Sequence, residues 1–211
     1  MVENEAVQPL SEEESLKIRQ ALKLKNESYK ILAPRFVYTD KNDGLRTSTC
    51  SLRIKASARF VVPGFRDITA YEIRKDAPTA SRISQHLVMI YASSKFAAGW
   101  RLWSADVKSA FLKGDPYMSG EREIYVEDVR RSDPSEPGVP LENGRLAKVR
   151  KGVFGLADAP RMWWLRMDRA LSERGWQRGM MDGACWYLRG AQRELRGIII
   201  SHVDDLLVTG A

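Results

Sequence analysis

Apolar positions that recur every three or four residues predict three helices in this chain. Their expected ranges are 12–29, 79–96 and 159–174. Ser11 and Glu14 have the spacing of a capping box at the start of the first helix. The third helix has Pro160 in its first turn and Gly175 just past its end, which is the usual asymmetry of helix termini.

Stretches rich in β-branched and aromatic residues predict strands around these helices. Their expected ranges are 31–40, 50–62, 100–105, 123–127, 145–150, 185–188, 195–201 and 206–209. Asp43-Gly44 indicates a turn between the first two, and the Pro/Gly-rich segment 131–140 must be a loop. Helices and strands in this mixed order favour an α+β domain with a largely antiparallel sheet.

The composition of the chain says less about its possible function than the pattern of apolar and polar positions says about its fold. A net charge of +7 and a pI near 9.5 are compatible with a polyanionic partner, although many basic proteins bind no nucleic acid. Cys50 and Cys185 are far apart and belong to no metal-ligand cluster, so a zinc site and a disulfide framework are both disfavoured. Without a signal-peptide layout or an apolar run of about 20 residues, we expect an intracellular protein and no membrane partner.

Three aspartates are the main candidates for chemistry. Asp204-Asp205 separates two apolar stretches, which places the pair at the tip of a tight hairpin. Asp is common in turns, but a two-residue hairpin prefers Asn-Gly or Asp-Gly, and adjacent like charges gain from a divalent cation. Asp106 ends another expected strand, so strand ends on one sheet could supply oxygen ligands for two-metal phosphoryl transfer.

Several motifs in order resemble the reverse transcriptase of copia-type LTR retrotransposons. They are Asp106-Val-Lys-Ser-Ala-Phe-Leu-Lys-Gly114, Glu123-Ile-Tyr-Val-Glu127, Phe154-Gly-Leu-Ala-Asp-Ala-Pro-Arg161 and His202-Val-Asp-Asp205, preceded by fingers-like segments at 58–65 and 77–84. The resemblance implies the fingers and palm of a right-hand polymerase, with a mainly antiparallel sheet packed on helices. It divides the chain into an N-terminal helical or linker segment (1–29), a fingers part (30–99) and a palm (100–211). Since the chain stops after the hairpin, we expect the thumb and RNase H parts of a longer polyprotein to be missing.

The resemblance also implies a role for each matching residue. Asp106, Asp204 and Asp205 would hold two Mg²⁺ ions, or Mn²⁺, for nucleotidyl transfer from a dNTP to a primer 3′-hydroxyl. Phe111 would lie under the sugar as a gate against a 2′-hydroxyl, although an isolated Phe is more often a core residue. Phe154 and Gly155 would form a loop against the incoming nucleotide, where an ordinary start of a helix is the alternative.

Basic and neighbouring residues complete the expected interface with the RNA/DNA template-primer. Arg59 would contact the triphosphate, and Lys148 and Lys151 would touch template phosphates, with plain surface solvation as the alternative for all three. His202 and Val203 would lie beside the primer terminus, where the family usually has Tyr before the Val. Trp163 and Trp164 are expected to pack the third helix on the sheet, with base stacking as the alternative.

A second hypothesis is a decayed relic that folds and binds nucleic acid without catalysis. The missing thumb favours it, as do departures from the family pattern at Ser57, Asp158 and His202. The intact aspartates favour the polymerase. For an active element, the expected location is the cytoplasm, in a virus-like particle, or the nucleus.

Overall fold

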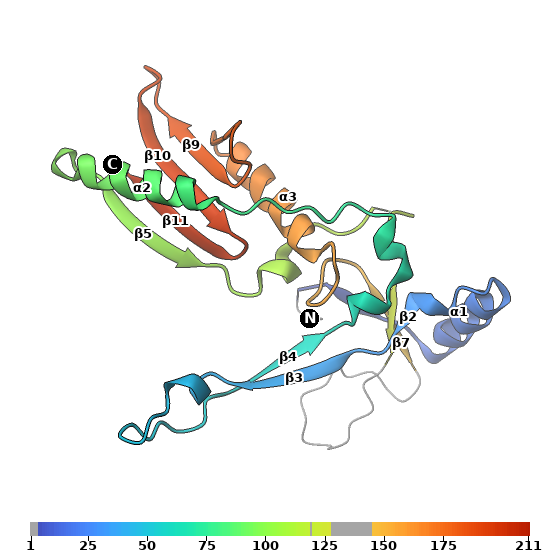
Figure 1. The fold of residues 1–211 in the computed structure, drawn as a ribbon. Helices are drawn as coiled ribbons and strands as arrows, with labels where there is room; N and C mark the ends of the chain where they lie inside the picture. The colour runs from blue at the N-terminus through green and yellow to red at the C-terminus, as the bar shows by residue number, and fades with distance from the viewer. Residues whose placement is uncertain (1–3, 119, 128–144) are drawn as a thin grey trace. The chain divides into compact units, whose positions relative to one another are not determined.

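The computed structural model describes residues 4–118, 120–127 and 145–211 (Figure 1). Along this part of the chain the helices and strands follow in the order β1 (Val7–Pro9), α1 (Glu12–Leu24), β2 (Ile31–Leu32), β3 (Arg35–Asp40), β4 (Ala56–Val61), α2 (Arg82–Ser94), β5 (Arg101–Asp106), β6 (Tyr125–Glu127), β7 (Leu146–Val149), α3 (Ala159–Ser172), β8 (Gln177–Arg178), β9 (Cys185–Arg189), β10 (Leu195–His202) and β11 (Asp205–Gly210). The mixed α/β content agrees with the sequence prediction. No helix among the described residues combines the length and apolar character needed to cross a membrane.

The chain forms two compact units, each made of two separate segments. The first unit contains Met1–Glu72 and Tyr117–Ala157, and the second contains Ile73–Pro116 and Asp158–Ala211. Residues distant in sequence therefore meet within each unit. The domain boundaries expected near residues 30 and 100 stay predictions.

Helix α1 of the first unit has the capping box that its sequence predicts. The Ser11 hydroxyl accepts a hydrogen bond from the Glu14 amide at 3.2 Å, and the Glu14 carboxylate accepts one from the Ser11 amide at 2.8 Å. These bonds satisfy backbone donors that the first turn leaves free. The helix ends at Leu24, before the expected Tyr29, because Asn26 adopts a left-handed conformation with φ +58°.

Two small sheets complete the first unit. One sheet has the strand order β1-β7-β6-β2. Among its described strand pairs β2–β6 is parallel and the others are antiparallel. The other sheet is the antiparallel pair of β3 and β4. Leu22, Tyr125 and Leu146 pack together between α1 and the four-stranded sheet. The buried Ser15 hydroxyl accepts a hydrogen bond from the Leu146 amide at 3.0 Å, which ties α1 to β7. The predicted loop at 131–140 lies outside the described residues.

The second unit is a five-stranded antiparallel sheet with a helix on each face. Its strands follow the order β5-β11-β10-β9-β8. Neighbours in a strand point to opposite faces, so Ile199 packs with α3 while Ile200 packs with the α2 side. Trp163 and Trp164 of α3 are each 8% exposed and lie in the first of these clusters. The expectation that they pack the helix on the sheet is confirmed.

Candidate active site

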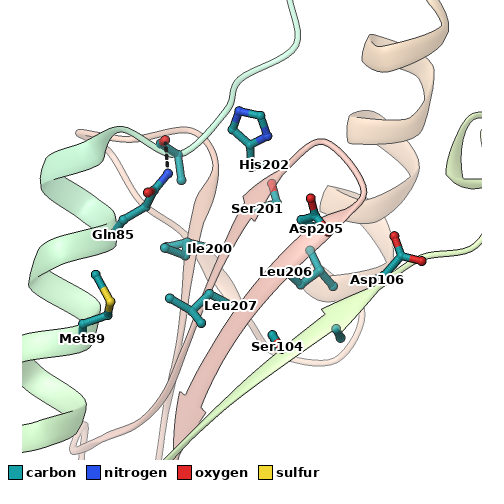
Figure 2. A pocket seen from close by; sticks show the side chains of 12 residues that line it. Gln85, Met89, Ser104, Asp106, Ile200, Ser201, His202, Asp205, Leu206 and Leu207 are labelled. Atoms are coloured by element: carbon teal, nitrogen blue, oxygen red, sulfur yellow. Dashed lines mark hydrogen bonds between the residues drawn. The ribbon is translucent and has the colours of Figure 1, made fainter. Parts of the chain in front are cut away.

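Two of the three candidate aspartates meet at the ends of neighbouring strands. Asp106 is the last residue of β5, Asp205 is the first residue of β11, and the antiparallel register places them directly opposite each other. Opposite residues of an antiparallel pair project from the same face, with Cβ atoms about 4.5–5.5 Å apart. Figure 2 shows both carboxylates at the hairpin end of the sheet. The pairing joins residues that are far apart in the sequence.

The third aspartate lies in the turn itself. His202 pairs with Asp205, so the turn consists of Val203 and Asp204. The predicted hairpin is confirmed, but placing both aspartates at its tip was wrong, because Asp205 already belongs to β11. Val203 takes the positive φ of +61° that the turn needs, at a position where glycine is usual.

Two hydrogen bonds fix this turn within the second unit. The Val107 amide, one residue past Asp106, donates to the Asp204 carbonyl at 3.0 Å. The Trp163 indole N–H donates to the Val203 carbonyl at 2.9 Å. The sequence did not predict either contact. A β-branched residue in a two-residue turn was the one local sign that something outside the turn holds it.

The three aspartate side chains have no charged partner in the part of the chain that the structure describes. Among residues 4–118, 120–127 and 145–211, none forms a hydrogen bond or ion pair with the side chain of Asp106, Asp204 or Asp205. Like charges directly opposite in a sheet are destabilising by up to about 1 kcal/mol. A bound cation would remove that repulsion, and carboxylate oxygens are the ligands that Mg²⁺ prefers.

The described residues contain no group of three His, Cys, Asp or Glu side chains placed to hold a metal ion together. Asp106, Asp204 and Asp205 are therefore close in the fold without converging as a finished three-ligand site. Mg²⁺ is usually held by one or two carboxylates together with substrate phosphates. A facing pair, Asp106 and Asp205, with a third carboxylate on the adjoining turn, fits that mode of binding.

An open cavity of about 830 Å³ lies beside the carboxylates, between α2 and one face of the sheet. Its rim includes Asp106, Asp205 and the exposed His202, and its deeper wall includes the apolar Ile200 and Leu207 (Figure 2). The structure therefore gathers two candidate metal ligands and one candidate nucleic-acid contact at one opening.

Asp182 fixes the helix that forms the far wall of this cavity. Its carboxylate accepts hydrogen bonds from the Ser81 amide and the Ala184 amide, each at 3.0 Å, and from the Ser84 hydroxyl. Burial alone would raise the pKa of Asp182, but these hydrogen bonds outweigh it and hold the pKa below its usual value of 3.8. The sequence did not predict this contact between the β9 side and the start of α2.

Phe111, the expected sugar gate, also belongs to the second unit. It lies in a short 3-10 turn, Ala110–Lys113, which follows β5. The ring is half-buried and packs against the cluster that contains Trp163. This packing gives the side chain a structural role, and the gate role stays a prediction.

Arg59, Phe154 and Gly155 belong to the first unit. Arg59 is exposed on β4, opposite Val37. The Phe154 carbonyl accepts a hydrogen bond from the Val62 amide at 2.8 Å. Gly155 has φ +95°, and a Cβ atom there would lie 2.0 Å from the Val62 carbonyl oxygen. Glycine is therefore required by the chain's own backbone, and the nucleotide contacts stay predictions.

The two expected template lysines are also in the first unit. Lys148 is half-buried on β7. The Lys151 ammonium donates to the Asn4 carbonyl at 2.9 Å, so this lysine already links two segments of the unit.

Asp158, one of the departures from the family pattern, is 4% exposed and immediately precedes α3. Its carboxylate is thus largely shielded from solvent.

The family model for "Reverse transcriptase (RNA-dependent DNA polymerase)" matches residues 20–211. The chain belongs to this family. It is 27% identical over 196 residues to the retrovirus-related Pol polyprotein from transposon TNT 1-94 of Nicotiana tabacum, covering 88% of the chain and 13% of that protein. It is 26% identical over 184 residues to the Pol polyprotein from transposon RE1 of Arabidopsis thaliana, covering 85% and 11%. The family resemblance read from the motifs is confirmed, and the chain spans about an eighth of these relatives' length.

Proposed function

We propose that this chain is the catalytic core of an RNA-directed DNA polymerase, which adds nucleotides from dNTPs to a primer 3′-hydroxyl. The observation that carries the proposal is the pairing of Asp106 with Asp205 beside the turn that bears Asp204. Membership of the reverse transcriptase family supports the reaction type. The net charge of +7 suits a nucleic-acid partner.

In this proposal Asp106 and Asp205 hold divalent ions from the sheet, and Asp204 approaches them from the turn. When bound, two Mg²⁺ ions supply activation of the primer hydroxyl and neutralise the charge of the triphosphate. His202 offers an imidazole to the primer terminus from the same rim of the cavity. The half-buried Phe111, whose ring packs against the cluster of Trp163, is the proposed gate beneath the sugar against a 2′-hydroxyl.

The first unit supplies contacts to the polyanionic substrates. Arg59 is proposed to bind triphosphate oxygens, because an exposed guanidinium suits bidentate phosphate contacts. Phe154 and Gly155 form the proposed nucleotide loop, and Lys148 and Lys151 the proposed template contacts. We also propose that the chain acts as part of a longer Pol polyprotein, as the names of its relatives suggest. Its proposed location is inside the cell.

Primer extension on an RNA template with Mg²⁺ or Mn²⁺ tests the proposal. Wild type is expected to incorporate dNTPs, and Asp204→Asn is expected to lose incorporation because a metal ligand is weakened without a change in size. Asp43→Asn removes an equivalent charge from a carboxylate that is 87% exposed in the first unit, and it serves as the matched control. Equal incorporation by wild type and Asp204→Asn would refute the catalytic role.

The alternative is a folded relic that binds nucleic acid without catalysis. His202 in place of the usual Tyr, at the rim of the cavity, is the observation that most favours it. The burial of Asp158 weakens it, because a carboxylate that is 4% exposed is largely shielded from a polyanionic partner. Template-primer binding without incorporation by wild type, in either metal, would establish this alternative.

A further inference from the structure

The turn that carries Asp204 is strained. Val203 is β-branched and sits at φ +61°, a region that such residues rarely occupy. A conformation of this kind persists only where the surroundings fix it. The hairpin pairing with β10 and β11 alone would be better served by glycine at this position.

Each carbonyl of the turn accepts one hydrogen bond from outside the hairpin. The Asp204 carbonyl is bound by the Val107 amide at 3.0 Å, and the Val203 carbonyl by the Trp163 indole at 2.9 Å. Trp163 is 8% exposed and packs in the cluster that contains Trp186 and Met167. Its indole N–H is therefore a rigid donor, with little freedom to follow the turn if the turn moves.

We propose that Trp163 is a positioning residue for the carboxylates. Its hydrogen bond holds the Val203 peptide in the strained orientation and so sets where Asp204 stands relative to Asp106. The proposal deepens the proposed function, because it assigns to α3 the task of presenting a metal ligand that lies on another element. Trp163 itself touches neither metal nor substrate in this scheme.

The neighbouring tryptophan provides a matched control. Trp164 lies on the same helix, is also 8% exposed and also donates its indole N–H, at 3.0 Å, but its acceptor is the Gly183 carbonyl before β9. Replacing either indole by a phenyl ring removes one hydrogen bond and a similar volume. The two variants differ in which backbone carbonyl loses its donor.

Amide exchange of Val107 measures the turn without requiring any activity. This amide is bonded to the Asp204 carbonyl, so loosening of the turn exposes it. In Trp163→Phe we expect Val107 exchange to become about threefold to tenfold faster, the effect of losing one ordinary hydrogen bond. Trp164→Phe should leave it within about twofold of wild type, and a thermal scan of both variants verifies that they fold.

Binding of Mn²⁺ alone, followed by paramagnetic broadening of the amide signals of Asp106 and Asp205, measures the consequence for the site. The apparent Kd should rise by a similar factor in Trp163→Phe and stay unchanged in Trp164→Phe. In a Val203→Gly background, where the turn is no longer strained, Trp163→Phe should have a smaller effect. A residue that only filled the core would not show this dependence on Val203.

Equal effects of Trp163→Phe and Trp164→Phe on Val107 exchange would overturn the proposal, and so would no effect of either. Faster exchange with unchanged Mn²⁺ affinity would also overturn it, because the turn would then be held without consequence for the ligands. A wild type that binds no Mn²⁺ would refute the proposed function. Val107 exchange would still decide whether Trp163 holds the turn.

Discussion

The buried ion pair between Asp67 and Arg122 is expected to be a main determinant of the stability of the first unit. The Arg122 guanidinium donates to the Asp67 carboxylate at 2.6 Å, with side-chain exposures of 2% and 4%. It also donates to the Thr69 hydroxyl at 2.9 Å, and that hydroxyl donates to Asp67 at 2.6 Å. The network joins residues 67–69 to the chain just before β6.

Asp67→Asn keeps the size of the side chain and the oxygen that accepts from Thr69, but it removes the buried negative charge that faces the Arg122 guanidinium. Breaking a buried pair in this way costs about 3–5 kcal/mol, whereas an exposed pair contributes about 0–1 kcal/mol. With a urea m-value of about 1–3 kcal/mol/M, the unfolding midpoint should fall by about 1 M or more.

The assay is urea unfolding followed by far-UV circular dichroism. Lys17→Met, which breaks the exposed Lys17–Glu13 pair in the same unit, is the control and should shift the midpoint little. All six tryptophans belong to the second unit, so their fluorescence shows whether the loss extends beyond the first. Asp67→Asn combined with Arg122→Met should be less destabilised than the two single changes added together. Equal shifts for Asp67→Asn and Lys17→Met would refute the reasoning.

Three further predictions use the same unfolding assay. A residue with a side chain at a positive φ loses about 1–2 kcal/mol of unfolding free energy. Gly155→Ala should lose well over that amount, because its Cβ meets the Val62 carbonyl. Gly120→Ala, with φ +81° and open space around its Cβ, should lose only that amount. Asp182→Asn should destabilise the protein less at pH 3 than at pH 7. The folded-state pKa of Asp182 lies below its usual value of 3.8. The carboxylate therefore stabilises the fold above pH 3.8, and this stabilisation is lost as the pH falls through the folded-state pKa. An equal destabilisation by Asp182→Asn at both pH values would contradict this reasoning. Ser11→Ala should cost about 1 kcal/mol and Ser11→Gly only a few tenths, because glycine is a tolerated N-cap; the reverse order would contradict the capping box.

Local signals predicted helices and strands well where they were strong. Helix α2 begins at Arg82 after Ser81, whose hydroxyl accepts from the Ser84 amide, three residues later than the expected start. The stretch 31–40 splits into β2 and β3 around Pro34, which has no N–H to donate to a ladder. Strands β1 and β8 were missed because segments of two or three residues show no periodicity. The expectation of one sheet was wrong, since the strands of the described residues divide among three sheets.

The sequence by itself determined the type and order of most elements, the capping box of α1 and the family, because propensity, capping and motifs depend on neighbouring residues. Only the tertiary structure decided that Asp205 faces Asp106, that Val203 takes the strained position, and that the Trp163 indole donates to the Val203 carbonyl. It also showed that Gly155 is needed for a close approach to Val62. These features depend on strand register and on contacts between distant segments, which no periodicity along the chain encodes.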